Sequence, residues 1–268
     1  PKKFINLLKN NNISFYCGVP DSILKGFSNE IEKTKNVKHI ITPNEGLAIS
    51  LAAGYNLSTD KLSCVYLQNS GLGNTINPIS SIIHQKVYSI PLLLLIGWRG
   101  SPKIKDEPQH KVKGLITKSL LKLLDIKYIE ISNDFKKIKN LINYAKVNSK
   151  PVAILVKKNQ FKDKKSNNKI SNGILRSNFI SKLLNLIKKK NKIISTTGFT
   201  SRELFQLRSS KNYNLSKDFY MVGGMGHASS LALGVSITYK NEIICLDGDG
   251  ALLMHLGSMN LIGHIANK

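Results

Sequence analysis

The amino-acid sequence predicts an α/β fold made of two doubly wound parallel-sheet domains, the second of them incomplete. Short apolar runs rich in β-branched residues alternate with longer segments that have helical spacing. The runs are continuously apolar, as is typical of strands buried on both faces of a parallel sheet. A polar, lysine-rich stretch, residues 157–173, interrupts the alternation once, and the pattern then restarts. This stretch has the composition of a linker between two domains.

The first domain is expected to span residues 1–160. Asp21 precedes its first predicted helix and Asn44 opens the second, and both residue types commonly cap helix N-termini. The predicted strands are 13–17, 37–41, 62–67, 90–97, 128–131 and 152–156, and the predicted helices are 22–33, 44–57, 74–84, 115–124 and 135–147.

The linker is expected over residues 161–174 and the second domain over residues 175–268. The predicted strands of this domain are 193–195, 219–222 and 243–246, and the predicted helices are 179–188, 201–207, 227–238 and a last one from 252 onward. An open sheet of so few parallel strands leaves its edges uncovered. We therefore expect that the chain holds only the N-terminal part of this second domain.

Composition narrows the class of protein. The 268 residues are 41% hydrophobic and 21% charged, which is typical of a globular chain. The formal net charge is +24, but the lysines are spread over the whole chain and form no aromatic-interleaved stripe or DNA-reading motif. We therefore expect no nucleic-acid partner. The excess positive charge would instead help to attract an anionic substrate.

The sequence also bears on cellular location. The longest apolar run, residues 90–96, is far shorter than the roughly 18–20 residues that span a bilayer. Residues 1–4 do not resemble a signal peptide, and because the chain lacks an initiator Met, we expect its start to be missing. Cys17, Cys64 and Cys245 lie far apart in apolar strands and are interpreted as core residues of a reduced protein. The prediction is a cytoplasmic protein with no membrane partner.

Three loops of the predicted second domain follow strands, where open parallel sheets bind ligands. Asp249 lies between two glycines, residues 222–234 place three glycines before a helix of small residues, and residues 195–205 begin with "STTGF". Glycine permits close backbone approach, and a carboxylate beside helix amides suits a hard cation that bridges phosphates. The structural alternatives are that Asp249 caps the next helix, that the glycines form a tight turn, and that Met225 is a core residue.

Polar residues follow strands in the first domain as well. Glu45 begins a helix, either because the helix dipole favours a carboxylate there or because it exchanges a proton with a ligand. Asn69 and Ser70 follow another strand, and residues 97–110 form a predicted long polar loop. No Walker loop, Gly-x-Ser-x-Gly elbow or Gly-x-Gly-x-x-Gly after the first strand is present, which excludes those signatures.

Six motifs, in order and spacing, resemble the thiamine-diphosphate-dependent decarboxylases, and among them the phosphonopyruvate and sulfopyruvate decarboxylases. The motifs are "GVPDS", "QNSGLGNTINP", "IGWRG", "DEPQH", "TTGFTSRELF" and "GGMGHASSLALG". Asn-Glu-Gly at 44–46 and Gly-Asp-Gly-Ala at 248–251 add to them. The resemblance covers nearly the whole chain. It implies a pyrimidine-binding domain over 1–160 and a diphosphate-binding domain over 175–268, both of the thiamine-diphosphate-binding type.

The resemblance implies roles for residues of this sequence. Glu45 would hydrogen-bond the aminopyrimidine ring of thiamine diphosphate, Met225 would hold the cofactor bent, and Asp249 would ligate Mg²⁺. Asp21 and His110 match acid/base positions of related decarboxylases, although His110 and Arg99 would alternatively only brace their loop. The implied cofactor-binding residues are Glu45, Thr197, Gly198, Gly224, Met225, Gly226, Gly248, Asp249, Gly250 and Ala251, and the implied substrate-binding residues are Asn69, Ser70, Arg99 and Arg202.

The implied reaction is decarboxylation of 3-phosphonopyruvate to phosphonoacetaldehyde and CO₂, in phosphonate biosynthesis, with thiamine diphosphate and Mg²⁺ as cofactors. Sulfopyruvate decarboxylation is the alternative within the class, and a non-catalytic, truncated cofactor-binding protein is the alternative outside it. In the family pattern a second Mg²⁺ ligand, an Asn, would fall beyond Lys268, so we expect a fragment of a longer enzyme. The family builds each active site from domains of two subunits, which implies a homo-oligomer.

Overall fold

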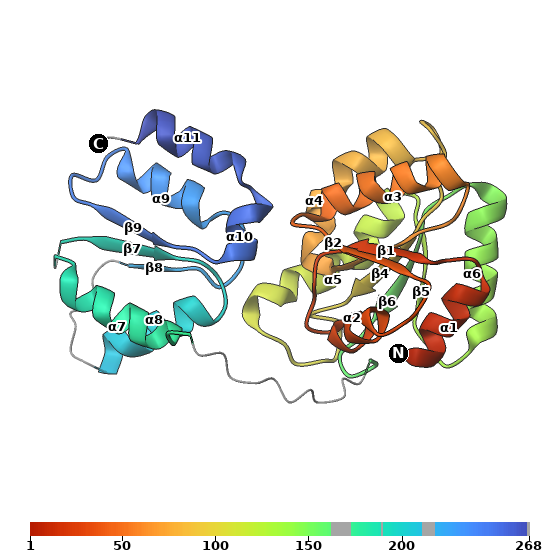
Figure 1. Ribbon diagram of the computed structural model, residues 1–268, viewed down its shortest axis with the longest axis horizontal. Helices are drawn as coiled ribbons and strands as arrows, with labels where there is room; N and C mark the ends of the chain where they lie inside the picture. Colours follow the sequence, from red (N-terminus) through yellow and green to blue (C-terminus); the bar gives the residue numbers. More distant parts are fainter. Residues whose placement is uncertain (162–172, 189, 211–217, 267–268) are drawn as a thin grey trace. The chain divides into compact units, whose positions relative to one another are not determined.

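The computed structural model describes residues 1–161, 173–188, 190–210 and 218–266. The chain divides into two compact units, residues 1–166 and 167–268 (Figure 1). Each unit is an α/β unit built on a parallel sheet, which confirms the predicted fold class. Residues 162–172, most of the predicted linker, lie outside the described residues.

The described part of the first unit has a six-stranded parallel sheet with the order β2-β1-β3-β4-β6-β5 (Figure 1). Its strands are β1 (Phe15–Gly18), β2 (Lys38–Ile41), β3 (Cys64–Gln68), β4 (Leu93–Gly97), β5 (Lys127–Glu130) and β6 (Val152–Val156). In the central pairs Cys64 lies opposite Leu93, and Leu93 lies opposite Val152. The strand order reverses between β1 and β3, so a ligand crevice is expected at the carboxyl ends of these strands.

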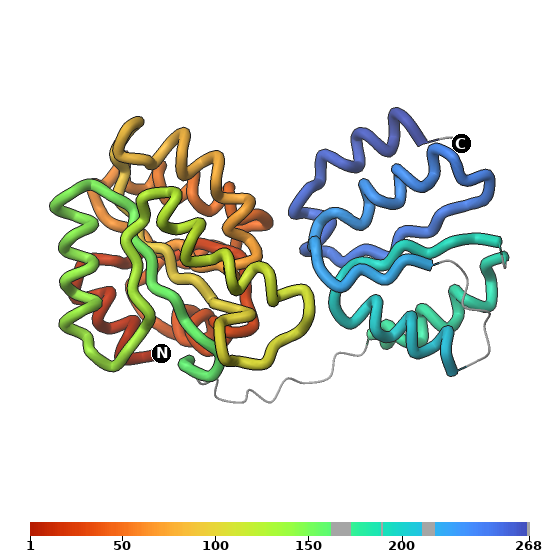
Figure 2. Tube along the Cα trace, turned by 180° about the vertical axis from the view of Figure 1, so that it is seen from behind, coloured from red at the N-terminus to blue at the C-terminus, as the bar shows by residue number. Residues whose placement is uncertain are grey.

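Helices cover both faces of this sheet, as the trace in Figure 2 also shows. One face carries α1 (Lys2–Asn10), α2 (Lys25–Glu32) and α6 (Phe135–Asn148), and the other carries α3 (Glu45–Thr59), α4 (Leu72–Pro78) and α5 (Pro108–Leu123). Every residue of β4 and β6 is buried, which is why these strands are continuously apolar in the sequence. None of the described helices is long and apolar enough to cross a membrane.

Three helices of the first unit differ from the sequence prediction. Helix α1 is not among the predicted helices, because its buried Phe4, Ile5 and Leu8 are surrounded by lysines and asparagines and no side chain caps it. The helix predicted to start at 115 begins at Pro108, because proline fits the first turn of a helix. The helix predicted over 74–84 divides after Pro78 into α4 and a π-helical turn, η2 (Ile79–Ile83). A short turn, η1 (Asn69–Gly71), precedes α4.

The described part of the second unit has a parallel sheet of three strands, as the sequence predicts, and the structure gives their order as β8-β7-β9. The strands are β7 (Lys192–Ser195), β8 (Phe219–Tyr220) and β9 (Ile243–Leu246). Figure 1 shows α7 (Arg176–Leu186) and α8 (Phe199–Ser210) on one face, α9 (Ala228–Ser236) and α11 (Gly257–Ile265) on the other, and α10 (Asp249–Met254) after β9. The strand order β8-β7-β9 has the same pattern as β2-β1-β3 in the first unit: the first strand in the sequence lies between the second and the third.

A buried ion pair fixes the edge strand β8 to its neighbours. Arg208 Nε donates to Asp218 Oδ2 at 2.9 Å, and the two side chains are 7% and 0% exposed. The other carboxylate oxygen accepts from the backbone amide of Ile193 at 2.9 Å. Because β8 has only two residues, its position depends on these side-chain bonds. Removing one partner would leave an uncompensated buried charge.

Candidate active site

The carboxyl ends of β1 to β4 gather the candidate residues of the first unit. Asp21 follows β1, Glu45 follows β2, Asn69 and Ser70 follow β3, and Arg99 follows β4. Parallel strands end at the same edge of a sheet, so these residues from distant parts of the chain come to lie on one edge.

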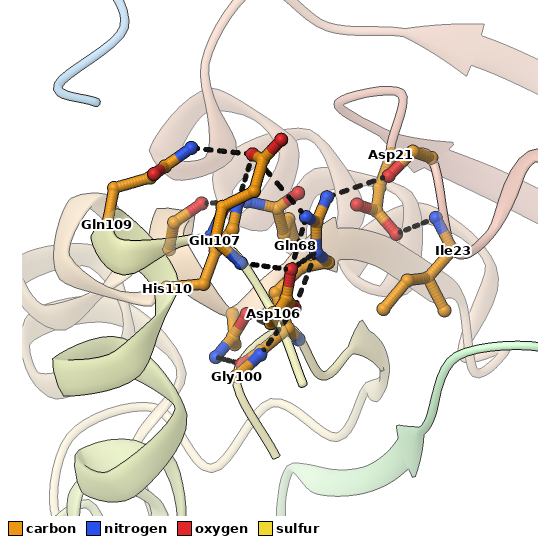
Figure 3. Close-up of polar contacts among 12 residues, drawn as sticks. Asp21, Ile23, Gln68, Gly100, Asp106, Glu107, Gln109 and His110 are labelled. Carbon is orange, nitrogen blue, oxygen red and sulfur yellow. Dashed lines mark hydrogen bonds and ion pairs between the residues drawn. The ribbon is translucent and has the colours of Figure 1, made fainter. Parts of the chain in front are cut away.

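Arg99 forms ion pairs with Asp106 and Glu107, two of the residues labelled in the polar cluster of Figure 3. Its Nε and Nη2 donate to the Asp106 carboxylate at 2.5–3.1 Å, and its Nη1 donates to Ser22 Oγ at 3.2 Å. Asp106 also accepts from the backbone amides of Gly100 and Glu107, at 2.8 and 2.9 Å. The Arg99 guanidinium holds the pKa of Asp106 well below its usual range. The loop between β4 and α5 is therefore folded around one bidentate ion pair.

Asn69 fixes the backbone of Arg99. Its Oδ1 accepts from the Arg99 amide at 3.0 Å, and its Nδ2 donates to the Arg99 carbonyl and to Thr117 Oγ1, both at 2.9 Å. Asn69 is buried, so its side chain links the end of β3 to the β4–α5 loop and to α5. Ser70 is only half-buried, and its Oγ accepts from Gln68 at 2.6 Å.

Asp21 and His110 are both buried, and each keeps a polar atom that no described residue satisfies. Asp21 Oδ2 accepts from the amides of Ile23 and Leu24 at 2.9 and 3.0 Å, whereas Oδ1 has no partner among the described residues. His110, on the first turn of α5, likewise has no hydrogen-bond partner for its Nδ1 among the described residues. Burial raises the pKa of Asp21 to about 6, and burial, together with Arg99, lowers the pKa of His110. Both groups are therefore suited to exchange protons with a ligand.

Asp21→Asn is expected to stabilise the protein at pH 7.5 but not at pH 4. The pKa of about 6 in the folded protein exceeds the roughly 3.9 of an unfolded Asp. As pH rises, the unfolded chain therefore releases this proton first, and stability is lost between about pH 4 and pH 6. The loss is roughly 2–3 kcal/mol, and the variant avoids it. Urea unfolding at both pH values checks this, and an equal difference at both would contradict it.

Glu45 is buried at the first position of α3. Asn44 caps the helix, with its Oδ1 accepting from the Gly46 amide at 2.7 Å, as the sequence predicts. Asn74 Nδ2 donates to Glu45 Oε2 at 2.7 Å. A Cβ atom on Gly71 would lie 2.1 Å from Glu45 Oε1, so only glycine leaves room for the carboxylate. The structure thus holds an oriented, buried carboxylate where the helix dipole stabilises it.

The carboxyl ends of β7, β8 and β9 gather the candidates of the second unit. Gly198, Gly224 and Gly226 have φ angles of 91°, 72° and 90°, which other residues rarely adopt. A Cβ atom on Gly250 would lie 3.3 Å from Met225 Cε, so the loop before α9 reaches the start of α10. Met225 is 40% exposed and therefore does not lie in the core.

Two further side chains at this edge have unsatisfied oxygens. Thr196 Oγ1 and Asp247 Oδ2 are buried without a hydrogen-bond partner in the described part of the chain. Asp249 is exposed and begins α10, whose cap position is Gly248, and its Oδ1 accepts from the Gly250 amide at 2.8 Å. Unsatisfied oxygens beside open glycine backbone fit a phosphate group with its cation.

A cation at this edge would have to share its ligands with that phosphate. The described residues contain no group of three His, Cys, Asp or Glu side chains that could hold a metal by themselves. Phosphate oxygens commonly complete the coordination of Mg²⁺. The donor set therefore fits a metal-bound diphosphate better than a metal ion alone.

The remaining candidates of the second unit divide into two groups. Thr197 is half-buried directly after β7, and Ala251 is buried in α10. A Cβ atom on Gly248 would lie 3.9 Å from Thr196 Cγ2. All three residues therefore lie at the carboxyl ends of β7 and β9. Arg202 instead lies on α8, with its guanidinium carbon 5.7 Å from the ring centre of Phe199. Its backbone amide donates to the carbonyl oxygen of Gly198 at 3.4 Å, so the start of α8 is joined to this glycine.

From the sequence alone no role was assigned to Asn74, Asp106 and Asp247, whereas Thr196 lies in the strand-end loop 195–205 that the sequence singled out. Asn74 and Asp106 lie within quoted motifs, and Asp247 lies beside one. What distinguishes them is a tertiary contact or the burial of an oxygen, which sequence spacing does not reveal. For Asn74, the partner Glu45 is 29 positions away. Asp247 directly follows β9, and this position was the signal available for it, whereas Asn74 and Asp106 lie several residues beyond the nearest strand end.

Two family models match the chain. "Thiamine pyrophosphate enzyme, N-terminal TPP binding domain" matches residues 2–120, and "Thiamine pyrophosphate enzyme, C-terminal TPP binding domain" matches residues 196–265. The matches fall on the first and the second unit, respectively, and include the strand ends described above. The chain belongs to the thiamine pyrophosphate enzymes.

Within this family the chain is similar to phosphonopyruvate and sulfopyruvate decarboxylases. Phosphonopyruvate decarboxylase from Streptomyces viridochromogenes is 30% identical over 94% of this chain and 66% of its own length, and that from Streptomyces hygroscopicus is 30% identical over 92% and 65%. Sulfopyruvate decarboxylase subunit alpha from Methanocaldococcus jannaschii is 36% identical over 56% of this chain and 88% of its own length. The chain thus spans just under two thirds of the two phosphonopyruvate decarboxylases.

Proposed function

We propose that the protein is a thiamine-diphosphate- and Mg²⁺-dependent decarboxylase that converts 3-phosphonopyruvate to phosphonoacetaldehyde and CO₂, in phosphonate biosynthesis. The observation that carries the proposal is the buried, oriented Glu45 carboxylate in a chain that matches both cofactor-binding models. When bound, thiamine diphosphate supplies the electron sink that a 2-oxo acid needs in order to lose CO₂.

The first unit supplies the proton chemistry in this proposal. Glu45 would face the aminopyrimidine ring with its buried carboxylate, in a position from which burial excludes competing water. Asp21 and His110 serve as acid and base, since each has an unsatisfied buried atom available to a ligand. The substrate-binding residues are Ser70 and Arg99 from this unit, with Asn69 fixing the Arg99 backbone, and Arg202 from the second unit.

The second unit holds the diphosphate end. Asp249 is the proposed Mg²⁺ ligand, and Thr196 and Asp247 offer buried oxygens at the same edge. Met225, close to Gly250, supplies an apolar surface for the cofactor. The proposed cofactor-contacting residues of this unit are Thr197, Gly198, Gly224, Met225, Gly226, Gly248, Asp249, Gly250 and Ala251.

A second copy of the chain is the proposed partner, with each active site at a subunit interface. The outer surfaces of α3 and α5 expose Leu47, Leu51, Val112 and Leu115, which are 55%, 38%, 65% and 69% exposed. Apolar side chains gathered on the helices that carry Glu45 and His110 favour burial against another protein surface.

The three cysteines are free thiols, which supports the proposed cytoplasmic location.

The test is CO₂ release by the full-length gene product with Mg²⁺ and thiamine diphosphate. Phosphonopyruvate, sulfopyruvate and pyruvate are compared side by side, and phosphonopyruvate is expected to have the highest kcat/KM. A preference for sulfopyruvate would move the assignment to the other group of relatives. Release of CO₂ from none of the three, with thiamine diphosphate bound, would favour a non-catalytic cofactor-binding protein and overturn the proposal.

A further inference from the structure

Glu45 is held by a residue to which the proposed function gives no part. Asn74, the third residue of α4, donates from Nδ2 to Glu45 Oε2 at 2.7 Å. The other carboxylate oxygen, Oε1, lies against the Cα atom of Gly71, where a Cβ would come within 2.1 Å of it. The two oxygens of Glu45 therefore have different surroundings: one accepts a hydrogen bond from an amide, and the other faces a residue without a side chain.

The backbone of α4 also fixes Asn74. A Cβ atom on Gly46, in the first turn of α3, would lie 2.8 Å from the carbonyl oxygen of Asn74. The starts of α3 and α4 are thus in direct backbone contact, and the Asn74 side chain cannot leave Glu45 without a rotamer change or a shift of α4 against α3. Asn74 is half-buried, so water competes only partly for its amide.

We propose that Asn74 is a positioning residue that gives the two oxygens of the Glu45 carboxylate different roles. An amide NH₂ group only donates hydrogen bonds, so Oε2 is held as an acceptor by Asn74. Oε1 is then the oxygen left to exchange a proton with a ligand. This inference rests on the proposed function, because the ligand group meant here is the aminopyrimidine ring of thiamine diphosphate.

The decisive variant is Asn74→Asp, which keeps the size of the side chain but replaces the donor with a second carboxylate next to Glu45. Like charges at this distance repel, so Glu45 cannot keep its present position and charge together. In the full-length gene product kcat is expected to fall on the order of 100-fold, with KM for the 2-oxo acid nearly unchanged. The dissociation constant of thiamine diphosphate is expected to rise about tenfold.

Binding of a second ligand distinguishes a loss of Glu45 positioning from a general disruption of the protein by the substitution. Inorganic diphosphate with Mg²⁺ should bind through the glycine loops of the second unit, so calorimetry should give the same dissociation constant for the wild type and for Asn74→Asp. Asn74→Ala removes the donor without adding charge and should reproduce the pattern with a smaller loss. It therefore serves as the test if Asn74→Asp fails to fold.

Asn77→Asp is the matched control. Asn77 lies on the same helix and is exposed, and its Oδ1 accepts from Ser81 Oγ at 3.0 Å. It should change neither kcat nor either dissociation constant. Equal behaviour of Asn74→Asp and Asn77→Asp in an active enzyme would overturn the inference and leave the proposed function standing. An inactive wild type whose affinity for thiamine diphosphate still falls in Asn74→Asp, but not in Asn77→Asp, would support the inference and overturn the function.

Discussion

Glu45→Gln is expected to slow decarboxylation by roughly a thousandfold or more, with little effect on folding. Glu45 is 5% exposed and accepts from Asn74, so its carboxylate is held away from water in one orientation. Glutamine fills the same volume beside Gly71 but cannot take up or release a proton, and a positioned acid/base group contributes roughly 10²–10⁴-fold to a rate. The loss of a charge that would otherwise face the cofactor ring adds to this effect.

The measurement is steady-state CO₂ release by wild type and variant at saturating thiamine diphosphate and Mg²⁺. Glu130→Gln is the matched control, because Glu130 is also a bonded carboxylate of the first unit, with Lys118 and Lys157 Nζ atoms at 2.7 and 2.6 Å from its oxygens. It lies on β5, at the sheet edge away from β1, and should retain wild-type kcat. A Glu45→Gln enzyme with full activity would remove Glu45 from the proton chemistry.

Gly100→Ala is expected to destabilise the first unit by about 3 kcal/mol or more and to abolish catalysis. Gly100 has a φ of 65°, which costs an L-residue roughly 1 kcal/mol. A Cβ atom here would also lie 2.0 Å from the carbonyl oxygen of His110, a backbone atom on the first turn of α5. Either the loop or the helix must move, and the movement breaks the bond from the Gly100 amide to Asp106 that helps to orient Arg99.

Gly73→Ala provides the contrast. Gly73 is exposed on α4, it has no positive φ, and a Cβ atom there would meet no heavy atom within 4 Å. Alanine favours the helix by roughly 0.5–1 kcal/mol, so this variant should be neutral or slightly stabilised. Urea unfolding of both variants, followed by far-UV circular dichroism, checks the pair. Equal midpoints of urea unfolding for the two variants would show that the close approach of Gly100 to α5 does not affect the free energy of unfolding.

The sequence was sufficient where a feature depends on neighbouring residues. Continuous apolar runs such as β4 and β6 indicated buried parallel strands because both of their faces are covered. Asn44 indicated a helix start because capping is a contact across two residues. By contrast, α1 escaped prediction because lysines and asparagines obscure its apolar face, and α5 was predicted too late because its first turns are polar.

The candidate site shows the same division. Motif order and glycine spacing alone pointed to the thiamine-diphosphate family, and to Glu45 and the glycine loops, because close backbone approach requires glycine in any fold of this kind. Only the tertiary structure decided that Asn74 holds one oxygen of Glu45, that Asp106 engages the Arg99 guanidinium, and that His110 lies in a helix. Local sequence sets backbone conformation and periodicity, whereas packing decides which strand ends and side chains become neighbours, and in this chain the contacts to Glu45 and Arg99 depend on that packing.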